Sequence, residues 1–307
     1  MTEYIHTSVL LHESIDNLNL RKGGVYVDGT LGSGGHLIEA LNHIGDSGLA
    51  LGIDQDEAAL ARTTERLAVL KKKALLVKNS YRNVAKVLDE HAHQLPQGEA
   101  KMDAFMLDLG LSSDQFETSG RGFTFRKDEP LLMTFNAVPN EETLTAREIV
   151  NVWDENNIAD VIYGYGEEKF SRKIAKGIVD ARAIKPIETT FELVDIIKKS
   201  TPGWYHHGKI HPATRTFQAL RITVNDEIGA LTEGLAQGFE RLRKGGRMAV
   251  ISFHSIEDRV VKRFMRHQSD AGLGQLITKK PLPPQDAELI RNPRARSAKL
   301  RVIEKIM

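Results

Sequence analysis

Three aspartates at the ends of apolar runs are the residues of this sequence whose type and spacing could do chemistry. Asp28 ends the run VYVD, Asp54 follows LALGI, and Asp108 ends FMLD. The loop GTLGSGG, which contains Gly32 and Gly34, comes directly after Asp28. A carboxylate can meet an ammonium group or accept ribose hydroxyls, and glycines let the backbone approach a ligand closely. The pattern predicts a site for a cationic ligand that carries a ribose.

The residues around the glycine loop distinguish between the ligands that such loops hold. A nucleoside triphosphate loop needs Lys and then Ser or Thr after its last glycine, where this chain has His36 and Leu37. A dinucleotide fingerprint starting at Gly32 and Gly34 would have a third glycine at position 37, which is again Leu37. The paired acids Asp28 and Asp54 favour S-adenosylmethionine. NAD and a purely structural glycine turn stay open as alternatives.

Asp108 is the candidate catalytic residue. It ends an apolar run at the predicted carboxyl edge of a sheet, where doubly wound folds bind ligands and do chemistry. Taken alone, an aspartate before Leu-Gly is more often a turn or helix-capping residue. Because Asp28 and Asp54 also end predicted strands, a role for Asp108 in a ligand site is favoured instead.

Short strands and amphipathic helices alternate in the first part of the chain and must position these acids. The pattern predicts strands over 25–28, 49–53, 74–77 and 104–108, and helices over 35–44 and 57–70. Helices over about 212–242 then lead into a strand over 248–252. Repeated strand–helix–strand units give an α/β fold with a mostly parallel sheet and helices on both faces.

The alternation stops after about Ser119 and resumes later, which indicates an insertion. Residues 141–199 have a helical pattern, with Thr143, Thr145 and the pair Thr189 and Thr190 as candidate helix caps. We therefore expect a discontinuous domain over 1–118 and 206–307, and an inserted all-helical domain over 119–205.

Composition narrows the class of protein. The 307 residues include no cysteine, which excludes disulfides, thiolate zinc sites and cysteine nucleophiles. No apolar run reaches the ~18 residues of a membrane span, and the first residues show no secretory signal, so we expect a cytoplasmic protein. From Lys262 onward, eleven Lys and Arg face four Asp and Glu. This basic end is a candidate surface for a polyanion, or simply a solvated one.

Eight segments in fixed order carry a resemblance to a known family. They are HTSVLLHE, VDGTLGSGGH, LDLGLSSDQF, RGFTF, YGEEKFSRKIA, HPATRTFQALRI, GGRMAVISFHSIEDR and NPRARSAKLR. The chain resembles the bacterial ribosomal RNA small-subunit methyltransferase H family, also called MraW. The resemblance implies a class I S-adenosylmethionine-dependent methyltransferase, Rossmann-like, that methylates N4 of a decoding-centre cytidine in 16S rRNA. It implies the small ribosomal subunit or its RNA as partner, no metal, and suggests a homodimer.

The resemblance also assigns roles to residues. Donor contacts fall on Gly34, Gly35, His36, Asp54, Tyr81, Asp108 and Gln115, to which the loop pattern adds Asp28 and Gly32. Candidate substrate-binding residues are Ser112, Ser113, His211, Arg215, Arg221 and His254. The two arginines are expected to clamp the RNA backbone near an extruded base, or else to pair with acids of the insert. The histidines at 206, 207 and 211 are not expected to bind zinc.

One segment departs from the family pattern. Where the family resembles Gly-Pro-Leu-Asp-Met-Arg-Met-Asp, this chain reads EPLLMTFN, with Leu132, Thr134 and Asn136 in place of charged residues. The departure leaves open a donor-binding ribosome-assembly factor with weakened or lost catalysis. An NAD-dependent oxidoreductase is the second alternative.

Overall fold

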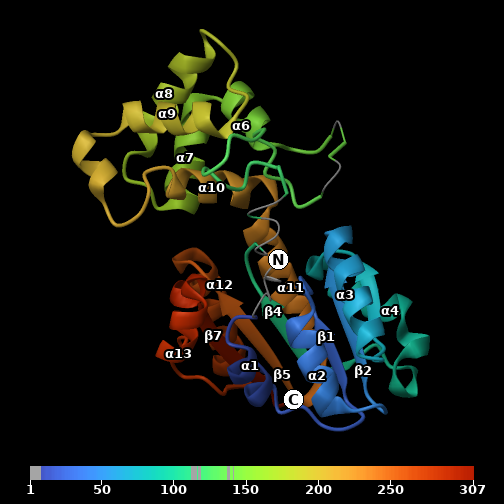
Figure 1. Ribbon diagram of the computed structural model, residues 1–307. Helices are drawn as coiled ribbons and strands as arrows, with labels where there is room; N and C mark the ends of the chain where they lie inside the picture. The colour runs from blue at the N-terminus through green and yellow to red at the C-terminus, as the bar shows by residue number, and fades with distance from the viewer. Residues whose placement is uncertain (1–7, 112–115, 117–118, 137–138, 141) are drawn as a thin grey trace. The chain divides into compact units, whose positions relative to one another are not determined.

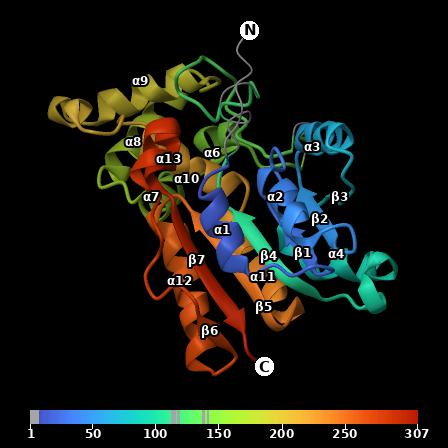
Figure 2. The same ribbon diagram turned by 60° about the horizontal axis from the view of Figure 1, so that its bottom comes forward.

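The computed structural model describes residues 8–111, 116, 119–136, 139–140 and 142–307. It divides into two compact units. The first combines Met1–Gly110 with Ile228–Met307, and the second is the continuous stretch Leu111–Glu227. Each is described by itself below, and Figures 1 and 2 show the elements of both.

The first unit is built on a twisted sheet. Seven strands of its described residues pair in the order β3-β2-β1-β4-β5-β7-β6. Neighbours from β3 to β5 are parallel, whereas β7 is antiparallel to both β5 and β6. The strands are β1 (Val25–Asp28), β2 (Leu49–Asp54), β3 (Leu75–Lys78), β4 (Met102–Asp108), β5 (Leu242–Ser252), β6 (Gly274–Leu276) and β7 (Lys299–Lys305).

Helices cover both faces of this sheet because successive strand residues point to opposite sides. Val25 and Val27 of β1 join one apolar core with α4, α11 and α12, whereas Tyr26 joins the other core with α1 and α2. The helices are α1 (Leu11–Leu18), α2 (Gly35–Ile44), α3 (Glu57–Val69), α4 (Val84–Glu90), α11 (Glu227–Arg241), α12 (Ser255–Asp270) and α13 (Asp286–Arg291), with short 3-10 turns at Tyr81–Asn83, Ala92–Gln94, Pro96–Gly98 and Pro293–Ser297.

The strand order reverses between β1 and β4. The chain moves outward from β1 to β2 and β3, and then crosses back to place β4 on the other side of β1. Ligands of open α/β sheets bind in the crevice outside the carboxyl ends of the strands at such a switch point. Asp28 and Asp108 end the two strands that flank it.

The predicted sheet elements are confirmed, with small shifts at their ends. β1 and α2 have the predicted bounds. β5 begins earlier than predicted, at Leu242 instead of Met248, because its register against β4 shifts between Met102 and Ala104 and lets the glycine-containing segment LRKGGR enter the strand.

The second unit is helical around its own apolar core, to which Ile149, Ile162, Ile178 and Ile197 contribute from four different helices. Its helices are α6 (Ala146–Val152), α7 (Glu155–Gly166), α8 (Ser171–Arg182), α9 (Thr190–Ser200) and α10 (Thr214–Val224), with a 3-10 turn at Gly203–His207. An inserted all-helical domain over 119–205 was expected. The unit extends further on both sides, to Leu111 and Glu227, and on the later side includes α10, whose Phe217 and Leu220 lie in the same core.

Two of the four threonines that were predicted to cap helices of this unit do so. The Thr145 side chain caps α6, and Thr189 forms a capping box with Glu192 at α9. Thr143 and Thr190 do not cap: the hydroxyl of Thr143 bonds Asn140, and that of Thr190 donates to the carbonyl of Lys127 (2.7 Å).

Side chains of the second unit hold the segment EPLLMTFN by hydrogen bonds to its backbone. The Arg121 guanidinium donates to the carbonyls of Thr134 (3.0 Å) and Phe135 (2.6 Å), and the Asn225 side chain bonds Met133 and Phe135. Thr134 is buried and its hydroxyl donates to the carbonyl of Asn136. An uncharged residue suits this buried position, because an unpaired charge there would be costly.

Among the described residues, no helix is both long enough and apolar enough to span a membrane.

Candidate active site

Asp28 is a buried carboxyl group at the end of β1. It is 2% exposed, and its oxygens accept the backbone N–H of Thr30 (3.1 Å) and the hydroxyl of Tyr26 (3.5 Å). Burial, reinforced by the charge of Asp54, raises the pKa of Asp28 to about 7. A bound cation would oppose that shift.

Asp54 ends β2 and ties the glycine loop to the sheet. Its Oδ2 accepts the backbone N–H of Gly32 (2.8 Å), and its Oδ1 accepts that of Asp56 (2.9 Å). Burial raises the pKa of Asp54, whereas these two bonds act in the opposite direction. The predicted ligand-binding acid therefore also shapes the loop.

Asp108 ends β4 with a buried carboxyl oxygen that no described residue bonds. Its backbone N–H donates to the hydroxyl of Thr30 (2.6 Å), but Oδ1 is buried without a hydrogen bond among the described residues. Oδ2 lies 3.9 Å from Nδ1 of His36. Burial, followed by the charges of Asp28 and Glu257, raises the pKa of Asp108 well above its usual range. Since an orphaned buried acceptor is costly, Oδ1 marks a place for a donor or cation supplied by a ligand.

The glycines of the loop are required by packing. At Gly34, which has φ +75°, an added Cβ would lie 2.6 Å from Cγ2 of Thr63 on α3. At Gly35 it would lie 1.9 Å from Oγ of Ser8. Gly32 also has a positive φ, of 51°. The loop is pressed against α3 and the N-terminal segment.

His36 and Tyr81 are both packed against the protein. His36 is 4% exposed, and its Nε2 lies 3.2 Å from the carbonyl of Val9. With the proton on Nε2 as donor in that bond, Nδ1 faces Asp108. Tyr81 begins a 3-10 turn after β3, and its Cδ2 would lie 2.5 Å from a Cβ added at Gly234 of α11. Contact of Tyr81 with an adenine ring stays a prediction.

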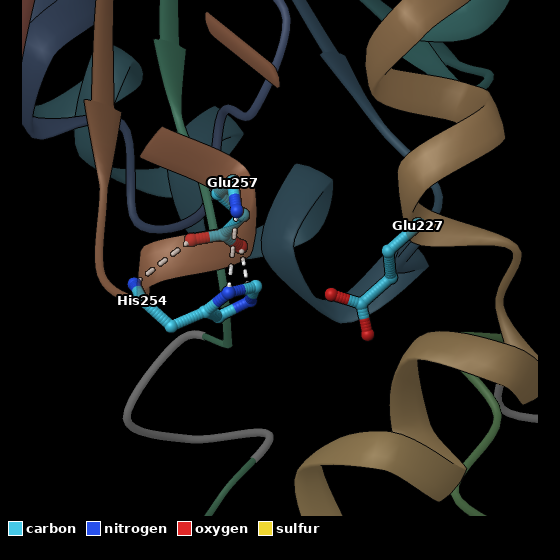
Figure 3. A group of neighbouring side chains, drawn as sticks. All are labelled: Glu227, His254 and Glu257. Carbon is cyan, nitrogen blue, oxygen red and sulfur yellow. Dashed lines mark hydrogen bonds and ion pairs between the residues drawn. The ribbon is translucent and has the colours of Figure 1, made fainter. Parts of the chain in front are cut away.

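His254 lies after β5 and caps α12 (Figure 3). Its Nδ1 accepts the backbone N–H of Glu257 (3.3 Å), and Oε2 of Glu257 accepts the backbone N–H groups of His254 (3.3 Å) and Phe253 (2.9 Å). Glu257 is 3% exposed, and its Oε1 is 3.1 Å from Nε2 of His254. This histidine, predicted to bind substrate, thus has a structural role at the carboxyl edge of the sheet.

Comparison with known proteins identifies the chain. The sequence pattern of the MraW methylase family matches residues 3–306. Proteins named ribosomal RNA small subunit methyltransferase H are similar over their whole length: one from Heliobacterium modesticaldum is 44% identical over 98% of both chains, and one from Geotalea uraniireducens is 43% identical over 100% of both. A third, from Lachnospira eligens, is 42% identical over 99% of this chain and 98% of its own.

The chain belongs to the MraW methylase family.

The sheet is accordingly that of a class I methyltransferase, and S-adenosylmethionine is the cofactor of this MraW family member, which excludes the NAD alternative. The residues present fit this group. Its sulfonium and ammonium are cationic, and the carboxyls of Asp28, Asp54 and Asp108 all have pKa values raised by burial. The charge of Asp54 further raises the pKa of Asp28, and the charge of Asp28 further raises that of Asp108.

Three of the predicted substrate-binding residues of this MraW methylase lie in the helical unit. His211 stacks on Phe125, with ring centroids 4.5 Å apart, and burial lowers its pKa. Arg215 donates to the carbonyl of Glu167 (3.0 Å). Arg221 forms a two-pronged pair with the buried Glu227 (2.7 and 2.8 Å), an acid outside the range 119–205 that was predicted for the insert. Ser112, Ser113 and Gln115 lie outside the described residues.

Sequence reasoning missed the residues that hold the acids in place. Thr30 bonds Asp28 and the backbone of Asp108, and Thr63 supports Gly34 from a neighbouring helix. Thr30 stands inside the glycine motif and could have been found as a polar residue two positions after Asp28. Thr63 gave no signal, because only the packing of α3 brings it to the loop.

Proposed function

We propose that this chain transfers a methyl group from S-adenosylmethionine to N4 of a decoding-centre cytidine in 16S rRNA. The curated relatives are named ribosomal RNA small subunit methyltransferases, and they match over the full length of this chain. The partner on this proposal is the small ribosomal subunit or its free RNA, in the cytoplasm. The metal-free site and the homodimer implied by the family resemblance remain part of the proposal.

The observation that carries the proposal is the buried Oδ1 of Asp108 at the switch point of the sheet, which has no hydrogen-bond partner among the described residues. An exocyclic amine is a poor nucleophile because its lone pair is delocalised into the cytosine ring. An acceptor that binds its N–H orients the lone pair and takes the proton that the nitrogen loses when the new N–C bond forms. Burial raises the pKa of Asp108, so Asp108 in its ionised form holds that proton more tightly than an exposed aspartate does.

We assign binding of the donor to Asp28, Asp54, Gly32, Gly34 and Gly35. Asp54 has spare lone pairs for the ribose hydroxyls, and Asp28 offers charge for the ammonium group. His36, Tyr81 and Gln115 complete the proposed donor site. When bound, the donor supplies an electrophilic methyl group on a sulfonium.

The proposed substrate-binding residues are in two parts of the chain. His254 is at the carboxyl edge of the sheet, whereas His211, Arg215 and Arg221 lie on the helical unit. Ser112 and Ser113, in the LGLSS segment that follows Asp108, are assigned to the same role.

Mass mapping of N4-methylcytidine in small-subunit RNA, from cells with and without the chain, tests the function directly. We expect the modification to disappear without the gene and to stay lost with Asp108→Asn, whose turnover should fall about 10²–10⁴-fold. Asp46→Asn, at an exposed aspartate, is the control. A wild-type chain that binds the donor but leaves the cytidine unmodified would instead support the assembly-factor alternative.

A further inference from the structure

Trp204 is a large aromatic side chain exposed on the helical unit. It lies in the 3-10 turn Gly203–His207, directly after α9, and is 63% exposed. Its ring packs edge-on against Phe170 (centroids 5.9 Å, 64°) and Tyr205 (5.9 Å, 85°). An exposed tryptophan inside an ordered cluster of this kind is typical of binding surfaces, because it presents apolar area to water at no benefit to the core.

The cluster is anchored to the core of the unit. Tyr205 donates its hydroxyl to Glu168, which is fully buried, and its ring contacts Phe170 (5.0 Å). Burial and this carboxylate raise the pKa of Tyr205 to about 12, so the phenol stays protonated at neutral pH. Beside it, the hydroxyl of Thr201 lies 3.0 Å from Nε2 of His206. Trp204 is therefore presented on a fixed base, which reduces the entropy that a ligand must overcome.

Cationic side chains surround the rings. The Nζ of Lys169 lies over the Trp204 ring, 4.8 Å from its centroid, and that of Lys173 lies over the Phe170 ring, 5.9 Å from its centroid. Both lysines are exposed. Arg172 is exposed on α8, the helix that carries Lys173, whereas Lys176 on the same helix pairs with Asp180 (3.2 Å). Lys198, Lys199 and Lys209 are exposed on the segment 198–209, which contains no acidic residue.

We propose that Trp204, Phe170, Lys169 and Lys173, together the Trp204 platform, bind an unpaired segment of the RNA substrate. A base stacks on the indole of Trp204 and the lysines contact the flanking phosphates, a combination by which proteins hold single strands. An acidic peptide would also be attracted by the lysines, but it would make no use of a flat aromatic face. The inference rests on the proposed function for its RNA partner, and assigns that partner a contact surface on the helical unit.

Binding of a labelled ten-nucleotide oligouridylate to the full chain tests the platform. We expect Trp204→Ala to weaken binding about tenfold, because stacking on one base is lost, and Trp204→Phe to stay within about threefold of the wild type. Tyr163→Ala is the matched control, since Tyr163 is 66% exposed on α7 without a basic residue among its nearest sequence neighbours. Lys169→Gln and Lys173→Gln should each reduce the slope of log K against log salt by about 0.7.

Several outcomes would overturn the platform. These are no binding by the wild type, equal binding by Trp204→Ala and the wild type, or equal loss when the oligomer is replaced by a duplex. Displacement by polyglutamate that depends on Trp204, with oligouridylate indifferent to it, would assign the surface to an acidic protein segment instead. Failure here is distinct from failure of the proposed function, which is read out by N4-methylcytidine and not by oligomer affinity.

Discussion

Asp28 combines burial with a charge that its proposed ligand needs. Its folded pKa of about 7 is far above that of an unfolded aspartate, so the native state binds the proton more tightly than the unfolded state. Its contribution to stability is thus fully present below about pH 4 and is lost as pH rises through about 7. At pH 8 Asp28 of the free protein is an ionised carboxylate, which burial destabilises. A cation bound beside it would stabilise this ionised form.

Binding of S-adenosylmethionine is therefore expected to release protons near neutral pH. The cationic donor favours ionised Asp28, so its affinity should fall as pH is lowered from 8 to 6. Calorimetry in buffers of different ionisation enthalpy measures the proton count. A count of zero at pH 7, with pH-independent affinity, would contradict the assignment of Asp28.

Asp28→Asn is expected to stabilise the free protein and to weaken donor binding. At pH 8 it removes a disfavoured charge while keeping an acceptor for the N–H of Thr30, so the free energy of unfolding should rise by about 2 kcal/mol. Donor affinity should fall. Denaturant unfolding and calorimetry measure the two effects, with Asp46→Asn as the control. A less stable variant with unchanged affinity would show that Asp28 is only a structural residue.

Asp54→Ala is expected to weaken donor binding by ~1.5–3 kcal/mol, as for loss of a charged hydrogen-bond acceptor. The structure adds a second effect, because Asp54 also accepts the N–H groups of Gly32 and Asp56. Measurement of the Kd at a temperature where the variant stays folded separates the two. Unchanged affinity would remove Asp54 from the site.

At the scale of elements, the turn from β1 into α2 and the start of α12 each depend on one particular residue. The first needs glycine at Gly34 because of its φ and because Thr63 of α3 is in the way. The second uses His254 as a cap, which is an uncommon choice beside Ser, Thr, Asp or Asn.

Gly34→Ala is expected to destabilise the protein by about 1–3 kcal/mol through strain and overlap with Thr63. Gly272→Ala separates the two causes, since Gly272 follows the end of α12 in the left-handed conformation (φ +70°) but has no atom within 4 Å of an added Cβ. Thermal unfolding of both variants gives the difference. Equal losses would mean that Thr63 yields freely and that only the backbone matters.

His254→Ala is expected to cost about 1 kcal/mol of stability through loss of the cap, and His254→Ser should restore it. The kcat and KM of the serine variant, measured with small ribosomal subunits as substrate, then test whether His254 also contacts the RNA. If the serine variant has wild-type kcat and KM, the histidine is a cap alone. A raised KM with restored stability would support contact with the RNA.

At the scale of the whole molecule, the chain divides its tasks between two units, each with its own apolar core. The helical unit is one continuous stretch of sequence, as expected for a domain inserted into another domain. We expect residues 111–227, expressed alone, to show a helical circular dichroism spectrum and one cooperative thermal transition. A molten, non-cooperative fragment would mean that its core depends on the rest of the chain.

The sequence by itself determined the sheet, the three strand-end acids and the family. Short apolar runs and glycine punctuation are local signals, so β1 and α2 could be bounded to the residue, and eight motifs in a fixed order indicated the family. Only the tertiary structure decided that Oδ1 of Asp108 has no partner within the described part of the chain, that His254 caps a helix, and that Arg221 pairs with Glu227. These depend on what packing brings near each side chain, which distant segments such as α3 and α10 supply and no local pattern encodes.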